Sequence, residues 1–111
     1  MNYKILGQNI AKIRIQNHLT QEKLAEKTGV STVFVSQIET AVRKPSLETL
    51  YKISLELNTT IDFLIGNNSS QVYYDEIAML IKDKNPLEIS FITRVLREIC
   101  RSIKDEKIIE Q

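Results

Sequence analysis

Two short amphipathic segments joined by a turn of three residues most strongly restrict how this 111-residue chain can fold. Helical spacing of apolar residues predicts a helix over residues 21–28, and Gly29 follows it where a left-handed residue would end the helix. Ser31 is suited to cap a second helix, whose inward residues are Val35 and Ile38. Because the turn is short, we expect the two helices to pack directly against each other as a helix-turn-helix.

Three further helices are expected around this pair. Apolar residues at helical spacing predict helices over about residues 4–16, 47–57 and 61–65. In the middle one, the residues at helical spacing are Leu47, Leu50, Ile53, Ser54 and Leu57. No segment alternates between apolar and polar residues with period two, and the chain has only three glycines and two prolines, too few for a turn-rich β protein. The predicted fold class is all-α.

A polar run of small residues after this five-helix unit indicates a domain boundary. We expect a domain over residues 1–66, a linker over 67–72 and a C-terminal helical hairpin over 73–111. In the hairpin, a short helix over 74–82 is expected to bury Ile77, Leu80 and Ile81, and Asn85-Pro86 is expected to break it. The following helix has apolar residues at steps of 3, 4, 3 and 4, which form one stripe: Ile89, Ile92, Leu96, Ile99 and Ile103.

Composition excludes several classes of protein. No apolar run approaches the roughly 18–20 residues of a membrane span, and the N-terminus lacks the features of a secretory signal. The single cysteine and single histidine, Cys100 and His18, are too few for a structural zinc site or an internal disulfide. The chain contains no nucleophile elbow, phosphate-binding glycine loop or metalloprotease motif. We therefore expect a cytoplasmic protein that is not an enzyme and needs no metal or cofactor.

Charge is divided unevenly along the chain. Residues 1–66 contain eight Lys or Arg and six Asp or Glu, which gives a net charge of +2. Residues 67–111 contain seven bases and eight acids, which gives −1. Any contact with nucleic acid is therefore expected to be a local basic patch on the N-terminal domain rather than a field over the whole chain.

The sequence resembles the phage repressor and Cro-like helix-turn-helix regulators, also called the xenobiotic-response-element family, over about residues 4–66. The motifs that carry the resemblance are QEKLA at 21–25, GVS at 29–31, SQIE at 36–39, PSLETL at 45–50 and DFLIG at 62–66. The resemblance implies a five-helix domain that binds double-stranded DNA. The sequence departs from the family at 40–42, where a tight stop such as Asn-Gly is usual.

The second helix of the motif is expected to lie in the major groove of DNA. Its first residues point into the groove, so Thr32 and Val33 are candidates for contact with base edges. Gln37 lies on the same face and has an amide that can pair with adenine, while Ser36 is adjacent. An ordinary polar helix face is the alternative for these four residues.

Phosphate contacts are expected from residues that flank the groove. Gln21 and Ser31 lie at helix N-termini, where backbone N–H groups favour an anion, and the resemblance implies the same role for Gln21. Arg43 and Lys44 follow the second helix of the motif and are suited to the phosphates beside it.

Arg14 and Glu39 are expected to have a structural role. In the repressors that this sequence resembles, an Arg in the first helix pairs with the Glu that ends the recognition helix. The resemblance thus implies an ion pair between Arg14 and Glu39 that fixes orientation. Contact of Arg14 with DNA is the alternative.

Together these features predict a sequence-specific transcriptional regulator of bacterial or phage type, most simply a repressor that binds a palindromic operator as a homodimer. The apolar stripe over residues 89–103 is expected to hold the two copies together. Packing of the hairpin on its own domain is the alternative. A second function hypothesis is an antitoxin or similar regulator whose tail binds a protein antagonist or toxin.

Overall fold

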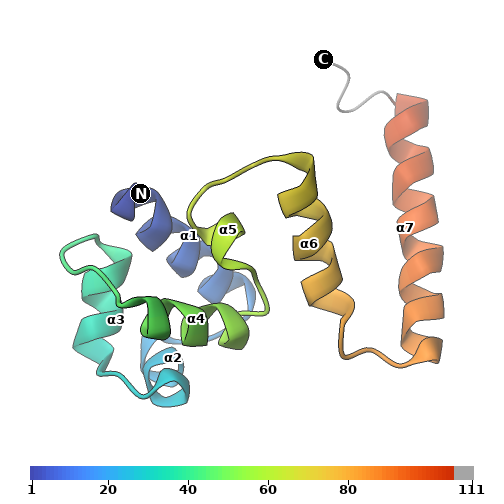
Figure 1. Ribbon diagram of the computed structural model, residues 1–111. Helices are drawn as coiled ribbons and strands as arrows, with labels where there is room; N and C mark the ends of the chain where they lie inside the picture. The colour runs from blue at the N-terminus through green and yellow to red at the C-terminus, as the bar shows by residue number, and fades with distance from the viewer. Residues whose placement is uncertain (107–111) are drawn as a thin grey trace. The chain divides into compact units, whose positions relative to one another are not determined.

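The structure of the protein is a computed structural model that describes residues 1–106, and all of its regular elements are helices, which confirms the all-α prediction (Figure 1). Residues 1–80 form one compact unit, and a second unit begins at Ile81. The N-terminal unit contains α1–α5 and nearly all of α6, and the second unit contains α7. The helices are α1 Tyr3–Gln16, α2 Gln21–Thr28, α3 Thr32–Glu39, α4 Leu47–Glu56, α5 Ile61–Leu64, α6 Ser70–Ile81 and α7 Pro86–Glu106.

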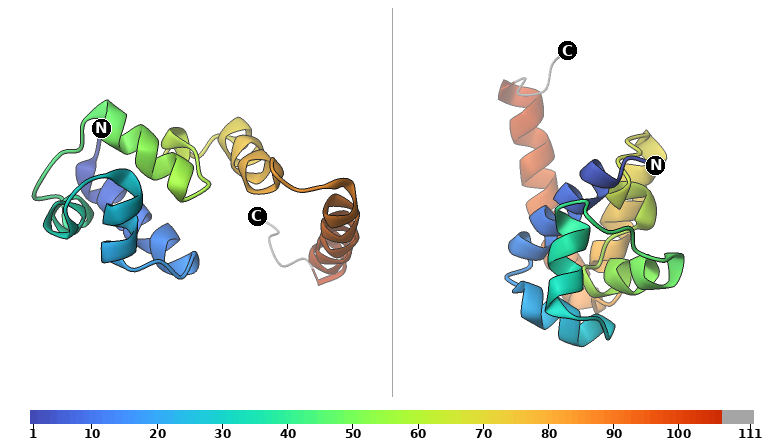
Figure 2. Two further views of the ribbon diagram at one scale, coloured as in Figure 1. Left: turned by 90° about the horizontal axis from the view of Figure 1, so that it is seen from below. Right: turned by 90° about the vertical axis from the view of Figure 1, so that its left-hand side faces the viewer.

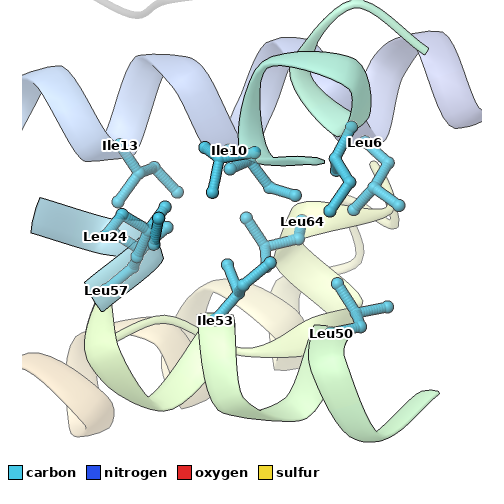
Figure 3. Packing of buried hydrophobic residues seen from close by; sticks show 11 residues of the cluster. Leu6, Ile10, Ile13, Leu24, Leu50, Ile53, Leu57 and Leu64 are labelled. Atoms are coloured by element: carbon cyan, nitrogen blue, oxygen red, sulfur yellow. The ribbon is translucent and has the colours of Figure 1, made fainter. Parts of the chain in front are cut away.

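One apolar core holds α1–α5 together. Figure 3 shows side chains of α1 meeting those of α2, α4 and α5 in its centre. Each such side chain stabilises the fold by roughly 1.5–3 kcal/mol when it is fully buried. The buried members of this core are Leu6, Ile10, Ile13, Leu24, Ala25, Val35, Ile38, Leu50, Ile53, Leu57 and Leu64.

Hydroxyl and amide side chains define where these helices begin. In each of α1–α5 the residue before the helix accepts a hydrogen bond from a backbone N–H of the first turn, which satisfies a donor that the helix itself leaves free. At the other end of α2, Gly29 has a φ of 74° and so takes the left-handed conformation expected from the sequence. The capping residues are Asn2, Thr20, Ser31, Ser46 and Thr60.

Leu47 shares the helical spacing of the buried residues of α4 but is not buried with them. Its side chain is 75% exposed, although Leu50 and Ile53 on the same helix are buried. Leu47 is the first residue of α4 and lies one turn before the first buried residue, so no neighbouring helix covers it. Tyr51 and Leu55, at i+4 and i+8, share this outer side and are exposed too.

Helix α6 begins at Ser70, within the stretch expected to be a linker over 67–72. The Ser69 hydroxyl accepts a hydrogen bond from the Val72 N–H, so part of this polar run caps a helix instead of forming an extended connection. Val72 is buried against the N-terminal unit. The first compact unit extends past this stretch to Leu80.

A carboxylate and an aromatic ring of α6 attach this helix to the rest of the N-terminal unit. The Glu76 carboxylate accepts hydrogen bonds from the buried Thr59 hydroxyl at 2.7 Å and from the Thr60 N–H at 3.0 Å. The Tyr73 ring packs edge-on against Phe63, with 5.8 Å between ring centroids. Glu76 thereby satisfies the Thr60 N–H, a backbone donor at the start of α5. The sequence analysis did not predict this contact.

The expected burial of Ile77 and Leu80 is not found. Their side chains are 48% and 55% exposed, and Ile81 is partly buried. The side of α6 that faces the N-terminal unit is instead defined by Val72 and Glu76, one turn apart. Ile77 and Leu80 therefore lie on an apolar side of α6 that the rest of the described chain covers only in part.

Helix α7 starts with a capping box. The Asn85 side chain accepts from the Glu88 N–H at 2.9 Å, and the Glu88 carboxylate accepts from the Asn85 N–H at 3.0 Å. Pro86 occupies the first helical position, where its missing N–H costs nothing. Asn85-Pro86 thus lies between α6 and α7, as expected, and also forms the start of α7. The last five residues of the expected segment 73–111 lie outside the described residues.

Candidate DNA-binding site

The recognition helix α3 lies at an edge of the N-terminal unit, and one of its long sides is free (Figures 1 and 2). Val35 and Ile38 are buried on the opposite side, where they pack against α1 and α2. The turn from Gly29 to Ser31 is the connection expected from the sequence. The structure therefore contains a helix-turn-helix whose second helix can meet another molecule along its length.

All four candidates for reading bases lie on the accessible part of α3. Thr32 is exposed and Val33 is 65% exposed, while Ser36 and Gln37 are partly buried. Within residues 1–106 none of the three polar side chains is engaged in a hydrogen bond, so their donors and acceptors are available to a ligand. An exposed apolar side chain such as Val33 suits contact with a thymine methyl group.

The end of α3 is anchored to α1 by an ion pair. Arg14 Nε donates to Glu39 Oε2 at 2.7 Å and Arg14 Nη2 donates to Glu39 Oε1 at 3.1 Å, which makes the contact bidentate. The two side chains are only 12% and 5% exposed. Arg14 Nη1 also donates to the Leu19 carbonyl at 2.8 Å. Each of the three guanidinium nitrogens therefore donates a hydrogen bond to another group of the protein. This geometry gives Arg14 a structural role.

Glu39 has a third partner that the sequence did not reveal. The Gln21 side-chain amide donates to Glu39 Oε1 at 2.9 Å. The structure thus brings a residue expected to contact phosphate into the same network as the Arg14–Glu39 pair. Through Glu39, the start of α2 and the end of α3 are both tied to α1, which fixes the two helices of the motif relative to each other.

Gly7 is a positioning residue that the sequence analysis missed. A Cβ atom at this position would lie 2.5 Å from the Ile38 carbonyl oxygen and 2.6 Å from that of Glu39. Only glycine allows α1 to approach the end of α3 so closely. A glycine inside a helical apolar pattern indicates close packing or function, and this one lies next to the inward residue Leu6.

The loop after α3 turns sharply, although it lacks the usual glycine. Ala41 has a φ of 62°, and the N–H groups of Val42 and Arg43 both donate to the Gln37 carbonyl, at 2.8 and 3.1 Å. Ala41 therefore adopts the left-handed conformation that glycine adopts more easily. The recognition helix therefore ends in a tight turn without a glycine.

The candidate phosphate-binding residues lie around α3. Arg43 and Lys44 are exposed, and the Lys44 ammonium lies 4.9 Å from the centroid of the Tyr3 ring. The Ser31 hydroxyl accepts from the Phe34 N–H at 3.0 Å, which leaves its own hydrogen free to donate. Ser31 and Arg43 thus lie near opposite ends of the recognition helix, as contacts to flanking phosphates require.

A helix-turn-helix family model matches residues 10–64 of the chain. The HTH-type transcriptional regulator YqaE of Bacillus subtilis is 31% identical over 80 residues, which span 71% of this chain and 69% of that protein. The chain belongs to this helix-turn-helix family. The membership expected from the motifs at 21–66 is thereby confirmed.

Other relatives carry related names. Control protein C.SmaI of Serratia marcescens is 34% identical over 62 residues, 56% of this chain and 74% of that protein. The immunity repressor protein of Bacillus phage phi105 is 34% identical over 64 residues, 58% of this chain and 44% of that protein. This family member is accordingly a DNA-binding regulator of transcription rather than an enzyme.

Among solved structures, a chain of the SinR protein/SinI protein complex is similar in fold, with a TM-score of 0.53 and 21% identity. The match covers 86% of this chain and 98% of that chain. Within the described residues no helix has the length and apolar character needed to cross a membrane.

Proposed function

We propose that this helix-turn-helix regulator is a cytoplasmic repressor that binds a palindromic operator as a homodimer. The observation that carries the proposal is the free side of α3, where unbonded polar side chains and the exposed Val33 lie between candidate phosphate contacts. A helix presented in this way fits the major groove of B-DNA. Repression would then follow from occupation of a promoter, and the relative named immunity repressor protein supports repression rather than activation.

Gln37 is proposed as the main reader of sequence. Its amide has one donor group and one acceptor, the pattern that adenine presents in the major groove, and within residues 1–106 no protein group engages that amide. Its backbone carbonyl accepts from Val42 and Arg43, so the residue is held at a fixed point of the helix end. Thr32, Val33 and Ser36 are proposed to contact neighbouring base edges.

Arg43 and Lys44 are proposed to bind phosphates, together with Gln21 and Ser31. Both basic side chains are exposed directly after the recognition helix. Contact of this kind adds affinity without sequence preference and makes binding weaker at high salt. Replacing both with Ala is expected to reduce the slope of log affinity against log salt by roughly 1–2 units.

The decisive experiment is selection from a randomised pool of duplex DNA with the wild-type chain and with Gln37→Ala. Wild type is expected to enrich an inverted repeat with half-site centres about one or more helical turns of roughly 34 Å apart. Gln37→Ala should lose about 1–3 kcal/mol of discrimination at one base pair in each half-site. Gln8→Ala, an exposed glutamine on α1, is the matched control and should keep the wild-type preference.

Failure to enrich any sequence would contradict sequence-specific binding. Identical preferences for wild type and Gln37→Ala would remove Gln37 as a reader and transfer that role to Thr32, Val33 and Ser36.

A protein antagonist or toxin bound by the C-terminal helices is the second candidate function. It is favoured by the apolar side chains that the described chain leaves exposed on α7, among them Phe91 and Ile99. The similar solved structure adds support, because it is a complex of two proteins, SinR and SinI. A chain that acts only through a protein partner should show no salt-dependent affinity for duplex DNA. Both activities are compatible in one chain, because they use different units.

A further inference from the structure

Helix α7 has a basic side in addition to its apolar stripe. Arg94, Arg97, Arg101 and Lys104 follow each other at steps of 3, 4 and 3 residues, and all four are exposed. At 3.6 residues per turn they fall within an arc of about 80° around the helix. They are all the bases of α7, gathered on one side.

The acidic residues of the described helix lie outside this arc. Glu88, Glu98 and Asp105 project at other angles, and Glu98 forms an ion pair with Arg101 from beside it. The exposed outer face of a helix that only needs solubility usually mixes both signs of charge. Separation of the two signs on one helix indicates a partner with an extended negative charge.

We propose that this basic stripe, Arg94–Arg97–Arg101–Lys104, is a second DNA-binding surface that contacts the phosphate backbone; the inference rests on the proposed function of the N-terminal unit. The stripe rises about 15 Å along the helix axis. Duplex DNA carries one charge per roughly 1.7 Å of its axis, so several phosphates lie within reach of the four side chains. Arginine is suited to this role because its planar fork matches phosphate oxygens.

The side chains next to the stripe fit such a contact. Ser90, Thr93, Arg94 and Arg97 line a shallow hollow on this side of α7. The Arg94 guanidinium lies 5.4 Å from the centroid of the Phe91 ring, which holds it at the edge of the stripe. Ser90 is exposed and adds a hydroxyl donor beside the guanidinium groups.

The basic stripe and the apolar stripe do not compete for the same surface. Their centres are about 140° apart around the helix. α7 can therefore pair through its apolar stripe with a second copy and still present its arginines to DNA. Because the chain links α7 covalently to the recognition helix, even a weak phosphate contact adds to the affinity of the whole protein.

The test uses the full chain and a 40-base-pair duplex of arbitrary sequence, with affinity measured by fluorescence anisotropy between 50 and 200 mM salt. Arg97→Gln/Lys104→Gln is the test variant, since glutamine keeps helix propensity. Two lost phosphate contacts should reduce the slope of log affinity against log salt by about 1.8. The ratio of wild-type affinity to variant affinity should therefore fall about tenfold between 50 and 200 mM salt. Lys82→Gln/Lys84→Gln, which removes the same charge outside α7, is the matched control and should change the slope by less than half as much.

Three results would overturn the proposal. An unchanged slope in Arg97→Gln/Lys104→Gln, while Arg43→Ala/Lys44→Ala lowers it, would reject the stripe and leave the proposed function intact. If Lys82→Gln/Lys84→Gln lowered the slope as much as the test variant, the effect of the stripe would come from the net charge of the chain and not from its position on α7. Unchanged DNA binding together with lost binding to vesicles of phosphatidylcholine and phosphatidylglycerol would assign the stripe to an anionic membrane. A wild-type chain that does not bind duplex DNA at all would contradict the proposed function itself.

Discussion

At the scale of single residues, the position of the recognition helix depends on a few contacts around its last turn. Glu39 joins Arg14 and Gln21, and the glycine at position 7 lets α1 come within reach of the same turn. These residues touch α3 from its buried side. They therefore fix how α3 is oriented and how its exposed side chains, among them Val33, are presented.

Replacing Gly7 with Ala is expected to destabilise the fold by about 1–3 kcal/mol, because the added methyl group would collide with two backbone carbonyls that cannot rotate away. Urea denaturation followed by circular dichroism measures the change in the free energy of unfolding. Gln8→Ala, the next residue on α1 and an exposed one, serves as control and should be nearly neutral. Equal stability of wild type and Gly7→Ala would show that α1 can move away from α3 at no cost.

The Arg14–Glu39 pair is expected to behave as a buried ion pair. Arg14→Met alone should lower the free energy of unfolding by about 3–5 kcal/mol, since it leaves the nearly buried Glu39 carboxylate with only Gln21 as a side-chain partner. Arg14→Met combined with Glu39→Leu should recover most of the loss, because no unpaired charge remains. A double variant no more stable than the single one would mean that the pair contributes more than charge compensation.

At the scale of secondary-structure elements, α6 depends on its contacts with α5 and the loop before it for its order. It is joined to α5 through the Glu76 carboxylate and to Phe63 through the Tyr73 ring, while Ile77 and Leu80 remain exposed. A helix of 12 residues is marginal on its own in water, so most of its stability must come from such contacts.

Glu76→Ala is expected to loosen α6 and leave α1–α4 intact. The buried Thr59 hydroxyl loses its partner, which should cost about 1–3 kcal/mol. Hydrogen exchange followed by mass spectrometry should show faster exchange in residues 70–81 and little change in residues 3–56. Asp75→Ala, an exposed neighbour on the same helix, is the control. Slow exchange retained across α6 would show that Val72 and Tyr73 are sufficient anchors.

At the scale of the whole molecule, the apolar stripe of α7 is where a second copy is expected to bind. Ile89, Ile92 and Ile103 are partly buried, whereas Leu96 and Ile99 are exposed, and the helix is 21 residues long. An amphipathic helix of this length with an uncovered apolar side is typical of helical association surfaces. Pairing of two such helices would also place two recognition helices in one assembly.

Leu96→Glu/Ile99→Glu is expected to convert a dimer into a monomer, because two carboxylates would have to be buried in the interface. Sedimentation velocity of the full chain measures the change. Ser90→Glu, about 140° around the helix from the centre of the apolar stripe, is the control and should leave the dimer intact. Loss of the dimer should weaken binding to an inverted repeat more than binding to a single half-site. A wild-type chain that sediments as a monomer would assign the stripe to another partner.

Local patterns in the sequence were sufficient to predict the helix-turn-helix, because its determinants are local. The caps at Thr20 and Ser31, the left-handed Gly29 and the apolar spacing of Val35 and Ile38 each act within a few residues. The bounds of α2 and α3 follow from them. The Arg14–Glu39 contact was inferred only through the resemblance, since the two residues are 25 positions apart.

Only the tertiary structure decided which residues beyond these patterns touch one another. The need for glycine at position 7, the third bond to Glu39 and the attachment of α6 through Glu76 all join segments distant in sequence. The exposure of Leu47 was decided in the same way, because a helical period shows which residues share a side and says nothing of where the core ends. Sequence by itself therefore determined the elements and the motif, whereas the folded chain decided how that motif is held: local hydrogen bonds act within one turn, but packing depends on neighbours that only folding brings together.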